Sequence, residues 1–255
     1  TVILNTDAGA NVGTYADAIA ITGQAGSNGF SPTNYNLSYV GADLVVNPRA
    51  VTLTALQQER AYGDTGALDE TAFTVTDLDG DSALPNGELI DTVILSTDAG
   101  ANVGTYADAI AITGQAGSNG FSASNYDLSY VTGDLVVNQR AVTLTASQQE
   151  RAYGDTMVLD ETAFTITDLD GDNALPNGEV IDTVALNSAT GVDISTTSNV
   201  GAYADEIVIT AQSGSNGFDA GNYDLTYVAG DLVVNQRAVT LTASQHERIY
   251  GEVLV

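Results

Sequence analysis

The stretch RAVTLTASQQERAYGDT, residues 140–156, reveals the repeats of the chain, because nearly the same sequence begins at Arg49 and, with small changes, at Arg237. Its first half alternates apolar and polar residues, and a period of two is typical of a half-buried β-strand. The sequence is therefore expected to form a tandem array of β modules, in which a functional motif either recurs in every module or belongs to one of them.

The repeat period is 91 residues, since Thr1 returns within the same words as Thr92 and Thr183. One copy is longer by six residues, all of them between Leu186 and Tyr203. A loop that accepts six extra residues is expected at a surface hairpin tip. The predicted domains are the C-terminal part of a module (1–48), two complete modules (49–139 and 140–236) and the N-terminal part of another (237–255).

Strands are predicted throughout module 49–139 from this alternation and from an abundance of Val, Ile, Thr and Tyr. Clusters such as Gly117–Gly120 favour turns between them. About seven short strands per module predict an all-β fold of small antiparallel, immunoglobulin-like sandwiches. The strand candidates are 50–55, 72–76, 90–96, 106–113, 126–131 and 134–138.

Neighbouring modules are joined without a Pro-rich or Gly/Ser-rich linker. Within Asp134–Leu144 the last strand of one module gives way to the first strand of the next over about three residues. Because short connections restrict hinges, we expect a semi-rigid, elongated row of modules.

The composition is strongly acidic, with 33 Asp and Glu against 6 Arg and a net charge of −27. Such a surface repels nucleic acid and anionic lipid, whose binding depends on clustered Arg and Lys. No apolar run approaches the roughly 18 residues of a membrane span, so this fragment is not expected to insert into a membrane. Any export signal is expected outside these residues.

Three short motifs recur in each complete module. In the second module they are Tyr153–Asp155, Asn199–Tyr203 and Asn222–Tyr227, the last followed by Gly230–Val234. This pattern resembles the MBG/YDG-type repeat of large bacterial surface adhesins, including filamentous-haemagglutinin-like proteins. The resemblance covers essentially the whole chain and implies a secreted or surface-anchored stalk of many modules. The same words occur earlier as Tyr62–Asp64, Asn102–Tyr106 and Asn125–Tyr130, and the first returns as Tyr250–Glu252.

All 12 Tyr and all 5 Phe fall on repeat-equivalent positions, and Trp is absent. A sugar-binding platform usually exposes aromatic rings, preferably Trp, whereas large rings dominate small cores. The aromatic residues are therefore interpreted as core and corner residues.

The six Arg are equally periodic. Arg49, Arg140 and Arg237 stand at module junctions, and the other three precede the Tyr-Gly-Asp or Tyr-Gly-Glu words. We expect them to form exposed structural ion pairs with the abundant carboxylates, each of which stabilises the fold only slightly.

An enzymatic function is not expected. The single His, His246, occupies the position of Gln58 and Gln149, so it cannot serve as an acid or base in every module. Cys and Lys, two common nucleophiles, are absent. We therefore predict no catalytic residue and no organic cofactor.

One acidic motif is a candidate calcium loop. DLDGDSALPNGE, residues 77–88, recurs as DLDGDNALPNGE at 168–179, with acids at positions 1, 3, 5 and 12. Its Gly stands at position 4 instead of 6, so a solvated hairpin turn is the alternative interpretation. The candidate Ca²⁺ ligands are Asp77, Asp79, Asp81, the carbonyl of Ala83 and Glu88, and in the next copy Asp168, Asp170, Asp172, the carbonyl of Ala174 and Glu179.

Two functions stay open on the sequence. The first is a structural spacer that holds an adhesive region away from the cell. The second is a ligand-binding module that recognises a glycan or a host or partner protein, for which the divergent loop 188–202 is the candidate surface. The expected partners are the neighbouring repeats of the same chain. Exposed strand edges also predict head-to-tail self-association, in which Ala238–Ala243 of one copy adds a strand to residues 1–48 of another.

Overall fold

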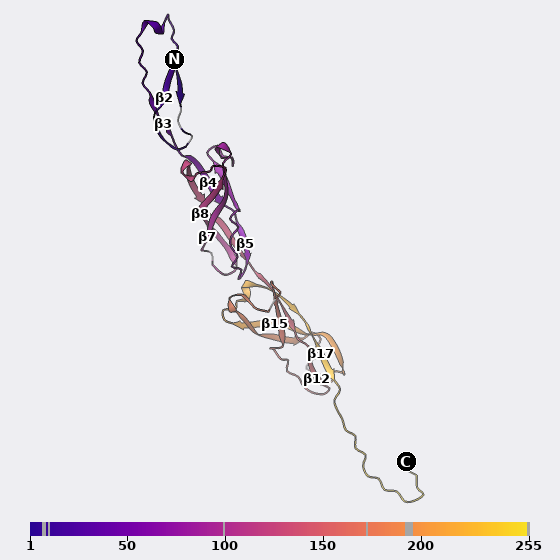
Figure 1. The fold of residues 1–255 in the computed structure, drawn as a ribbon. Coiled ribbons are helices and arrows are strands. Elements are labelled where there is room, and N and C mark those ends of the chain that lie inside the picture. Colours follow the sequence, from indigo (N-terminus) through magenta and orange to yellow (C-terminus); the bar gives the residue numbers. More distant parts are fainter. Residues whose placement is uncertain (7–8, 10, 99, 172, 192–195, 254–255) are drawn as a thin grey trace. The chain divides into compact units, whose positions relative to one another are not determined.

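The computed structural model describes residues 1–255 except 7–8, 10, 99, 172, 192–195 and 254–255, and it divides into two compact units (Figure 1). Unit 1 comprises Thr1–Arg60 and Thr65–Asn138, and unit 2 comprises Ala61–Asp64 and Gln139–Val255. The Tyr-Gly-Asp words at 62–64, which by sequence lie in the copy 49–139, therefore fold as part of unit 2.

The described residues of unit 2 form seven strands in two sheets. One sheet has the order β13-β11-β16, and the other has the order β12-β17-β15-β14. The strands are β11 (Arg140–Ala146), β12 (Gln149–Ala152), β13 (Phe164–Asp168), β14 (Val180–Ser188), β15 (Gly201–Ser215), β16 (Tyr223–Val228) and β17 (Gly230–Asn235).

Unit 1 repeats this arrangement and adds a three-stranded sheet from the residues before Arg49. Its sheets have the orders β1-β2-β3, β6-β4-β9 and β5-β10-β8-β7. The strands are β1 (Val2–Thr6), β2 (Gly13–Gln24), β3 (Ala42–Val46), β4 (Arg49–Ala55), β5 (Gln58–Ala61), β6 (Phe73–Asp77), β7 (Leu89–Thr97), β8 (Gly104–Ser118), β9 (Tyr126–Val131) and β10 (Gly133–Asn138).

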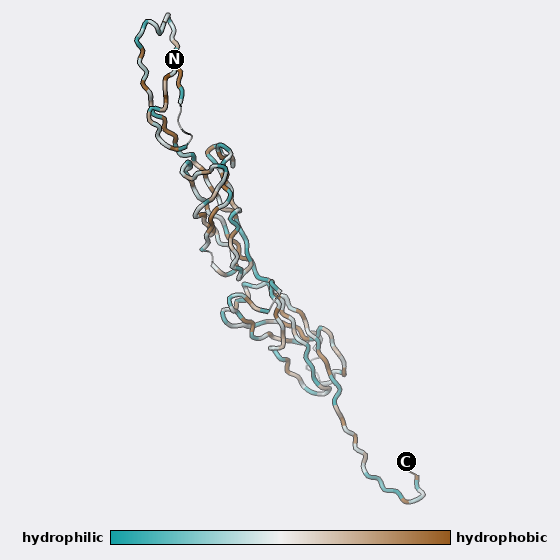
Figure 2. Tube along the Cα trace, viewed as in Figure 1, coloured by the Kyte–Doolittle hydropathy of each residue, from teal (hydrophilic) through white to brown (hydrophobic). Residues whose placement is uncertain are grey.

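The regular elements among the described residues are strands and short 3₁₀ turns, which confirms the all-β prediction. None of the helices in this part of the chain is long and apolar enough to cross a membrane. Short hydrophobic and hydrophilic stretches alternate along the chain in Figure 2, as the sequence pattern indicates. The 3₁₀ turns are Pro32–Asn34, Pro85–Gly87, Ala123–Asn125, Pro176–Gly178 and Ala220–Asn222.

The core of unit 2 follows from the alternation in β11. Val142, Leu144 and Ala146 are at most 3% exposed, while the residues between them are not buried. β11 also contacts β15 of the other sheet, which buries Ile207 and Ile209. Each fully buried aliphatic side chain stabilises the fold by roughly 1.5–3 kcal/mol. The immunoglobulin-like sandwich arrangement itself stays a prediction.

The expectation of antiparallel sheets is wrong for three strand pairs. β4 pairs with β9, β11 with β16, and β12 with β17 in parallel. Parallel neighbours need a long connection, and here most of a module lies between the two strands of the pairs β4–β9 and β11–β16. The first strand of each module is thereby bonded to a strand near its end, which closes the module.

The six strand candidates in module 49–139 all form strands, whereas β5 was not among them. In the segment 237–255 no described residue belongs to a strand, although its words match those of β11. Leu241 is 92% exposed there, while its counterpart Leu144 is 0% exposed. The reason is that residues 237–255 lack counterparts of β13 and β16, and a strand without hydrogen-bonded neighbours is not stable in water.

Candidate functional site

The Tyr-Gly-Asp words at 62–64 form a turn whose tyrosine is enclosed in unit 2. The backbone N–H of Asp64 donates to the carbonyl of Ala61 at 3.1 Å, which tightens the turn. Tyr62 is only 4% exposed, and its ring meets that of Tyr223 edge to face at a centroid distance of 5.4 Å. We call the surrounding residues the unit 2 socket: Arg140, Pro176, Asn177, Glu179 and Tyr223.

Glu179 is the buried acceptor of this socket. One of its carboxylate oxygens accepts the hydroxyl of Tyr62, and the other accepts the hydroxyl of Tyr223 at 2.7 Å. Asn177 Nδ2 donates to the Tyr62 hydroxyl at 3.3 Å. Burial, followed by the hydrogen bond to Glu179, raises the pKa of both tyrosines above the usual range. The two tyrosines thus stay neutral and can donate to the carboxylate.

Gly63 shows why glycine follows the tyrosine. Its φ of +82° is a left-handed conformation that side chains disfavour. In addition, a Cβ placed on Gly63 would lie 2.2 Å from Cβ of Pro176, far inside van der Waals contact. The backbone therefore passes so close to the socket wall that only glycine fits.

Arg140 fastens the acid of the turn to the acidic loop of the socket. Its Nη1 donates to Asp64 Oδ1 at 3.0 Å and to the carbonyl of Tyr62 at 3.5 Å. Its Nε and Nη2 donate to Asp168 Oδ2 at 3.0 and 2.8 Å, and Nη2 also contacts Asp170. Burial alone would lower the pKa of Arg140, but the bonds to Asp168 and Asp170 outweigh it and raise the pKa.

The prediction that the arginines lie exposed is wrong for Arg140 and Arg151, which are 4% and 6% exposed. The prediction of ion pairs holds for the three junction arginines. Arg237 repeats the contact of Arg140, since its Nη1 donates to Asp155 Oδ1 at 2.5 Å and to the carbonyl of Tyr153 at 3.4 Å.

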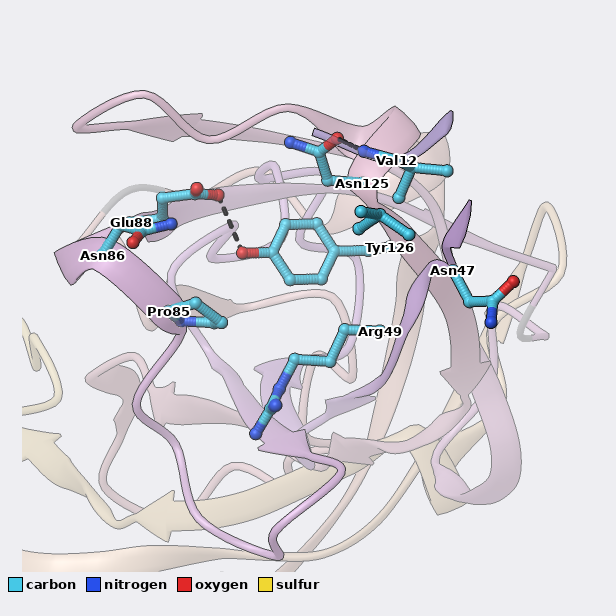
Figure 3. A pocket seen from close by; sticks show the side chains of 9 residues that line it. Val12, Asn47, Arg49, Pro85, Asn86, Glu88, Asn125 and Tyr126 are labelled. Carbon is cyan, nitrogen blue, oxygen red and sulfur yellow. Dashed lines mark hydrogen bonds between the residues drawn. The ribbon is translucent and has the colours of Figure 1, made fainter. Parts of the chain in front are cut away.

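In unit 1, the residues that correspond to the unit 2 socket line an open pocket (Figure 3). Tyr126 donates its hydroxyl to Glu88 at 2.7 Å, as Tyr223 does to Glu179. Burial and this bond raise the pKa of Tyr126 to about 12. We call this pocket the unit 1 socket, and its lining includes Arg49, Pro85, Asn86, Glu88, Asn125 and Tyr126.

A family model described as MBG domain (YGX type) matches residues 51–136 and 142–233. The chain belongs to this family. The resemblance noted in the sequence is thereby confirmed, and the first matched range contains Tyr62 and Gly63, the Tyr-Gly pair of the unit 2 socket. No curated protein and no solved structure matches the chain.

The acids of the predicted calcium loop are held by other partners. Asp77 accepts Nε and Nη2 of Arg49 at 3.0 and 2.6 Å, and Asp79 contacts the same guanidinium. Asp77 Oδ1 also accepts the backbone N–H of Asp79 at 2.8 Å, and Asp81 Oδ1 accepts that of Ala83 at 3.0 Å. The hydrogen bond from Arg49, chiefly, lowers the pKa of Asp77.

In unit 1, Asp77 and Asp79 thus accept hydrogen bonds from Arg49, and Glu88 accepts one from Tyr126. In the second copy, Asp168 and Asp170 lie on Arg140, and Glu179 lies on the two tyrosines. Ala174 is exposed, and Asp172 lies outside the described residues. No group of three or more acids or histidines that could hold a metal is found in the described part of the chain. Calcium binding stays a prediction.

The six-residue insertion is anchored by a residue that sequence reasoning missed. Glu206 is 3% exposed and accepts the hydroxyl of Ser188, the backbone N–H of Thr190 at 3.1 Å and the hydroxyl of Thr190. The other complete copy has Ala109 at this position. The substitution of alanine by glutamate within a predicted strand could have indicated this role. A carboxylate that becomes buried needs hydrogen-bond donors, and the neighbouring inserted loop can supply them.

Proposed function

We propose that these MBG repeats are structural spacer modules of a secreted or cell-surface bacterial adhesin and hold an adhesive region away from the cell. The main support is the unit 2 socket, in which the Tyr-Gly-Asp words of one sequence copy fold into a unit made largely of the next copy. A link of this kind lets successive repeats share one folded structure, so that a pull along the chain acts on a buried contact.

The recurrence of the same parts adds to this proposal. Arginine, the Pro-Asn-Gly-Glu words and the tyrosine that binds the glutamate all return at equivalent positions in both complete copies. A chain can therefore be lengthened by adding copies without any new contact chemistry. We propose no catalytic role, because in unit 2 the polar groups of the socket are engaged in holding the turn.

The experiment is a binding screen combined with small-angle scattering on the full chain. A spacer predicts an elongated particle and no binding to a glycan array or to extracellular host proteins. A compact particle would contradict the spacer function. Binding that disappears when the loop 188–202 is shortened by six residues would instead favour the ligand-binding module, with this loop, anchored by Glu206, as its surface.

A further inference from the structure

We propose that the first and last strands of each complete module form a shear clamp, which gives the module a high resistance to a pull along the chain. This rests on the proposed spacer function, because a stalk that is fixed at both ends carries load. It deepens that function by assigning the load to particular strands and to the residues that tie their ends.

In unit 2, the first two strands pair in parallel with the last two. β11 lies beside β16 over six register pairs, which begin with Arg140 opposite Tyr223. β12 lies beside β17 over four register pairs, which end with Ala152 opposite Asn235. Short connections separate β11 from β12 and β16 from β17, so the two pairs follow one another along the same two segments of the chain. We call the two pairs together the parallel ladder.

The direction of the strands decides how a pull acts on the parallel ladder. The chain enters the ladder at Arg140 and leaves it at Asn235, and these residues lie at opposite ends of it. A pull on both ends of the unit therefore draws the paired strands past each other, and the hydrogen bonds between them carry the load together. Strands that are pulled apart from one end lose their bonds one at a time instead. Because a single hydrogen bond contributes little on its own, the shared load gives the greater resistance.

Hydrogen bonds across the ladder tie both of its ends. At the entry, Gln139 Nε2 donates to the carbonyl of Gly221 at 3.1 Å, and these two residues precede β11 and β16. At the exit, Asn235 Nδ2 donates to Glu150 Oε2 at 3.0 Å, and the carbonyl of Asn235 accepts the backbone N–H of Tyr153 at 2.9 Å. Both points at which load reaches the unit are thus bonded to the opposite strand.

The Tyr-Gly-Asp turn lies at the entry of the ladder. Arg140 and Tyr223 are the first register pair, and both hold this turn. Arg140 Nη1 donates to Asp64, and the ring of Tyr223 meets that of Tyr62. Sliding of β11 past β16 moves Arg140 away from Tyr223 and so disrupts the unit 2 socket. The filled socket therefore adds resistance where the load enters.

Unit 1 repeats the main pair of the clamp. β4 lies beside β9 in parallel over six register pairs, which begin with Arg49 opposite Tyr126. Asn138, at the end of β10, donates through Nδ2 to Glu59 Oε2 at 3.0 Å. The clamp is therefore a property of the repeat, and both complete modules should resist a pull along the chain.

The experiment is single-molecule force spectroscopy on the full chain, held at its two ends. We expect two unfolding events at high force, one from each complete module. The two events are distinguishable, because the second module is longer by six residues and should release about 20 Å more chain.

The matched control is a pull on unit 2 in another direction. Handles on Ala189→Cys and Val200→Cys, at exposed positions of the connection between β14 and β15, peel this antiparallel pair from one end. Cysteine is absent from the natural sequence, so the attachment is specific. We expect an unfolding force at least about twofold lower in this direction, because the bonds fail one at a time.

Variants at the load points test the clamp without removing a buried group. Gln139→Ala combined with Asn235→Ala removes two exposed ties across the ladder. This variant should lower the force of unit 2 when the chain is pulled at its ends, and it should leave the force between the two handles unchanged. Gln148→Ala is the control, because this exposed side chain donates to Glu150 within the same segment and not across the ladder.

Two outcomes would overturn the proposal. One is an unfolding force of unit 2 that is equal in the two directions. The other is a force between the chain ends that the paired Gln139 and Asn235 variant lowers no more than Gln148→Ala does. Neither outcome touches the spacer function, which is tested by particle shape and by the binding screen, so a failure of one can be told from a failure of the other.

Discussion

The unit 2 socket encloses Tyr62, whereas the unit 1 socket, built from the same residue types one repeat earlier, is an open pocket. The clearest difference lies in the arginine, whose side chain is 5% exposed in Arg140 and 28% exposed in Arg49. The bond from tyrosine to glutamate is the same in both, at 2.7 Å. The acceptor carboxylate is thus in place with or without the turn, so the turn binds a surface that is already formed.

The largest expected effect comes from removing the enclosed ring. Tyr62→Ala leaves a cavity beside Tyr223 and deprives buried Glu179 of a donor, so we expect unit 2 to lose about 3–5 kcal/mol of unfolding free energy. Urea unfolding, with hydrogen exchange of the β11 amides to identify unit 2, measures the loss.

The matched control is Tyr153→Ala, at the equivalent position of the next copy, where the residue is 42% exposed. It should cost under about 1 kcal/mol, because little apolar area returns to water. Equal losses in the two variants would show that enclosure of the ring contributes nothing specific.

A smaller effect separates backbone strain from contact with the socket wall. Gly63→Ala and Gly154→Ala both force alanine into a positive φ, +82° and +83°. Only Gly63→Ala also creates a steric clash, because the added Cβ would lie 2.2 Å from Pro176. At Gly154 the nearest atom to an added Cβ belongs to Arg237 and is 3.5 Å away. We expect Gly63→Ala to cost about 1–3 kcal/mol more than Gly154→Ala, the usual range for overpacking.

Thermal and urea unfolding of both variants measure this difference. If the two glycine variants lose the same stability, the close approach of Pro176 is absorbed by small shifts. The tight fit would then not explain why glycine follows the tyrosine.

The sockets also show how far the sequence could predict this protein. Alternation in Arg140–Ala146 predicted β11 and its buried side, because the period of the residues sets which of them face the core. The identity of its neighbours could not be predicted in this way. The parallel pairing with β16 depends on the path of the chain between them, which the local pattern does not encode.

The sequence analysis named the acids of the site but did not predict their hydrogen-bond partners. Glu88 and Glu179 were grouped with the nearby aspartates because their spacing matches a calcium loop. In the fold, both glutamates accept hydrogen bonds from tyrosine hydroxyls, while Arg49 and Arg140 donate hydrogen bonds to the aspartates. These contacts join residues about 30 to 120 positions apart, a separation at which spacing motifs carry no information.

At high pH, the two units should lose stability at different rates, because their sockets contain different numbers of buried tyrosines. An unfolded tyrosine titrates near about pH 10, whereas the pKa of Tyr126 is raised to about 12 and those of Tyr62 and Tyr223 are raised as well. A raised folded-state pKa gives stability that is fully present below about pH 10 and is lost as the pH rises through the folded value.

Each such tyrosine contributes up to about 1.4 kcal/mol per pH unit in this window, and the unit 2 socket has two of them against one in unit 1. We expect unit 2 to lose stability more steeply between about pH 10 and about pH 12. Urea unfolding across this range measures the slopes. Tyr62→Phe should bring the unit 2 slope to that of unit 1, and an unchanged slope in this variant would contradict the assignment.

The smallest expected effect is that of calcium. Both oxygens of Asp77 already accept hydrogen bonds, one from Arg49 and the other from the backbone N–H of Asp79. An ion would have to displace a guanidinium that bonds the same carboxylate through two nitrogens. If the loop binds calcium as predicted, Ca²⁺ should raise the Tm of a unit more than Mg²⁺ does at equal ionic strength, whereas equal shifts would reflect screening alone and contradict the prediction. A rise in calcium only, abolished by Asp81→Ala, which leaves both arginine contacts of Asp77 and Asp79 intact, would establish the calcium loop. Because Arg49 is the more exposed arginine, such a rise should appear first in unit 1.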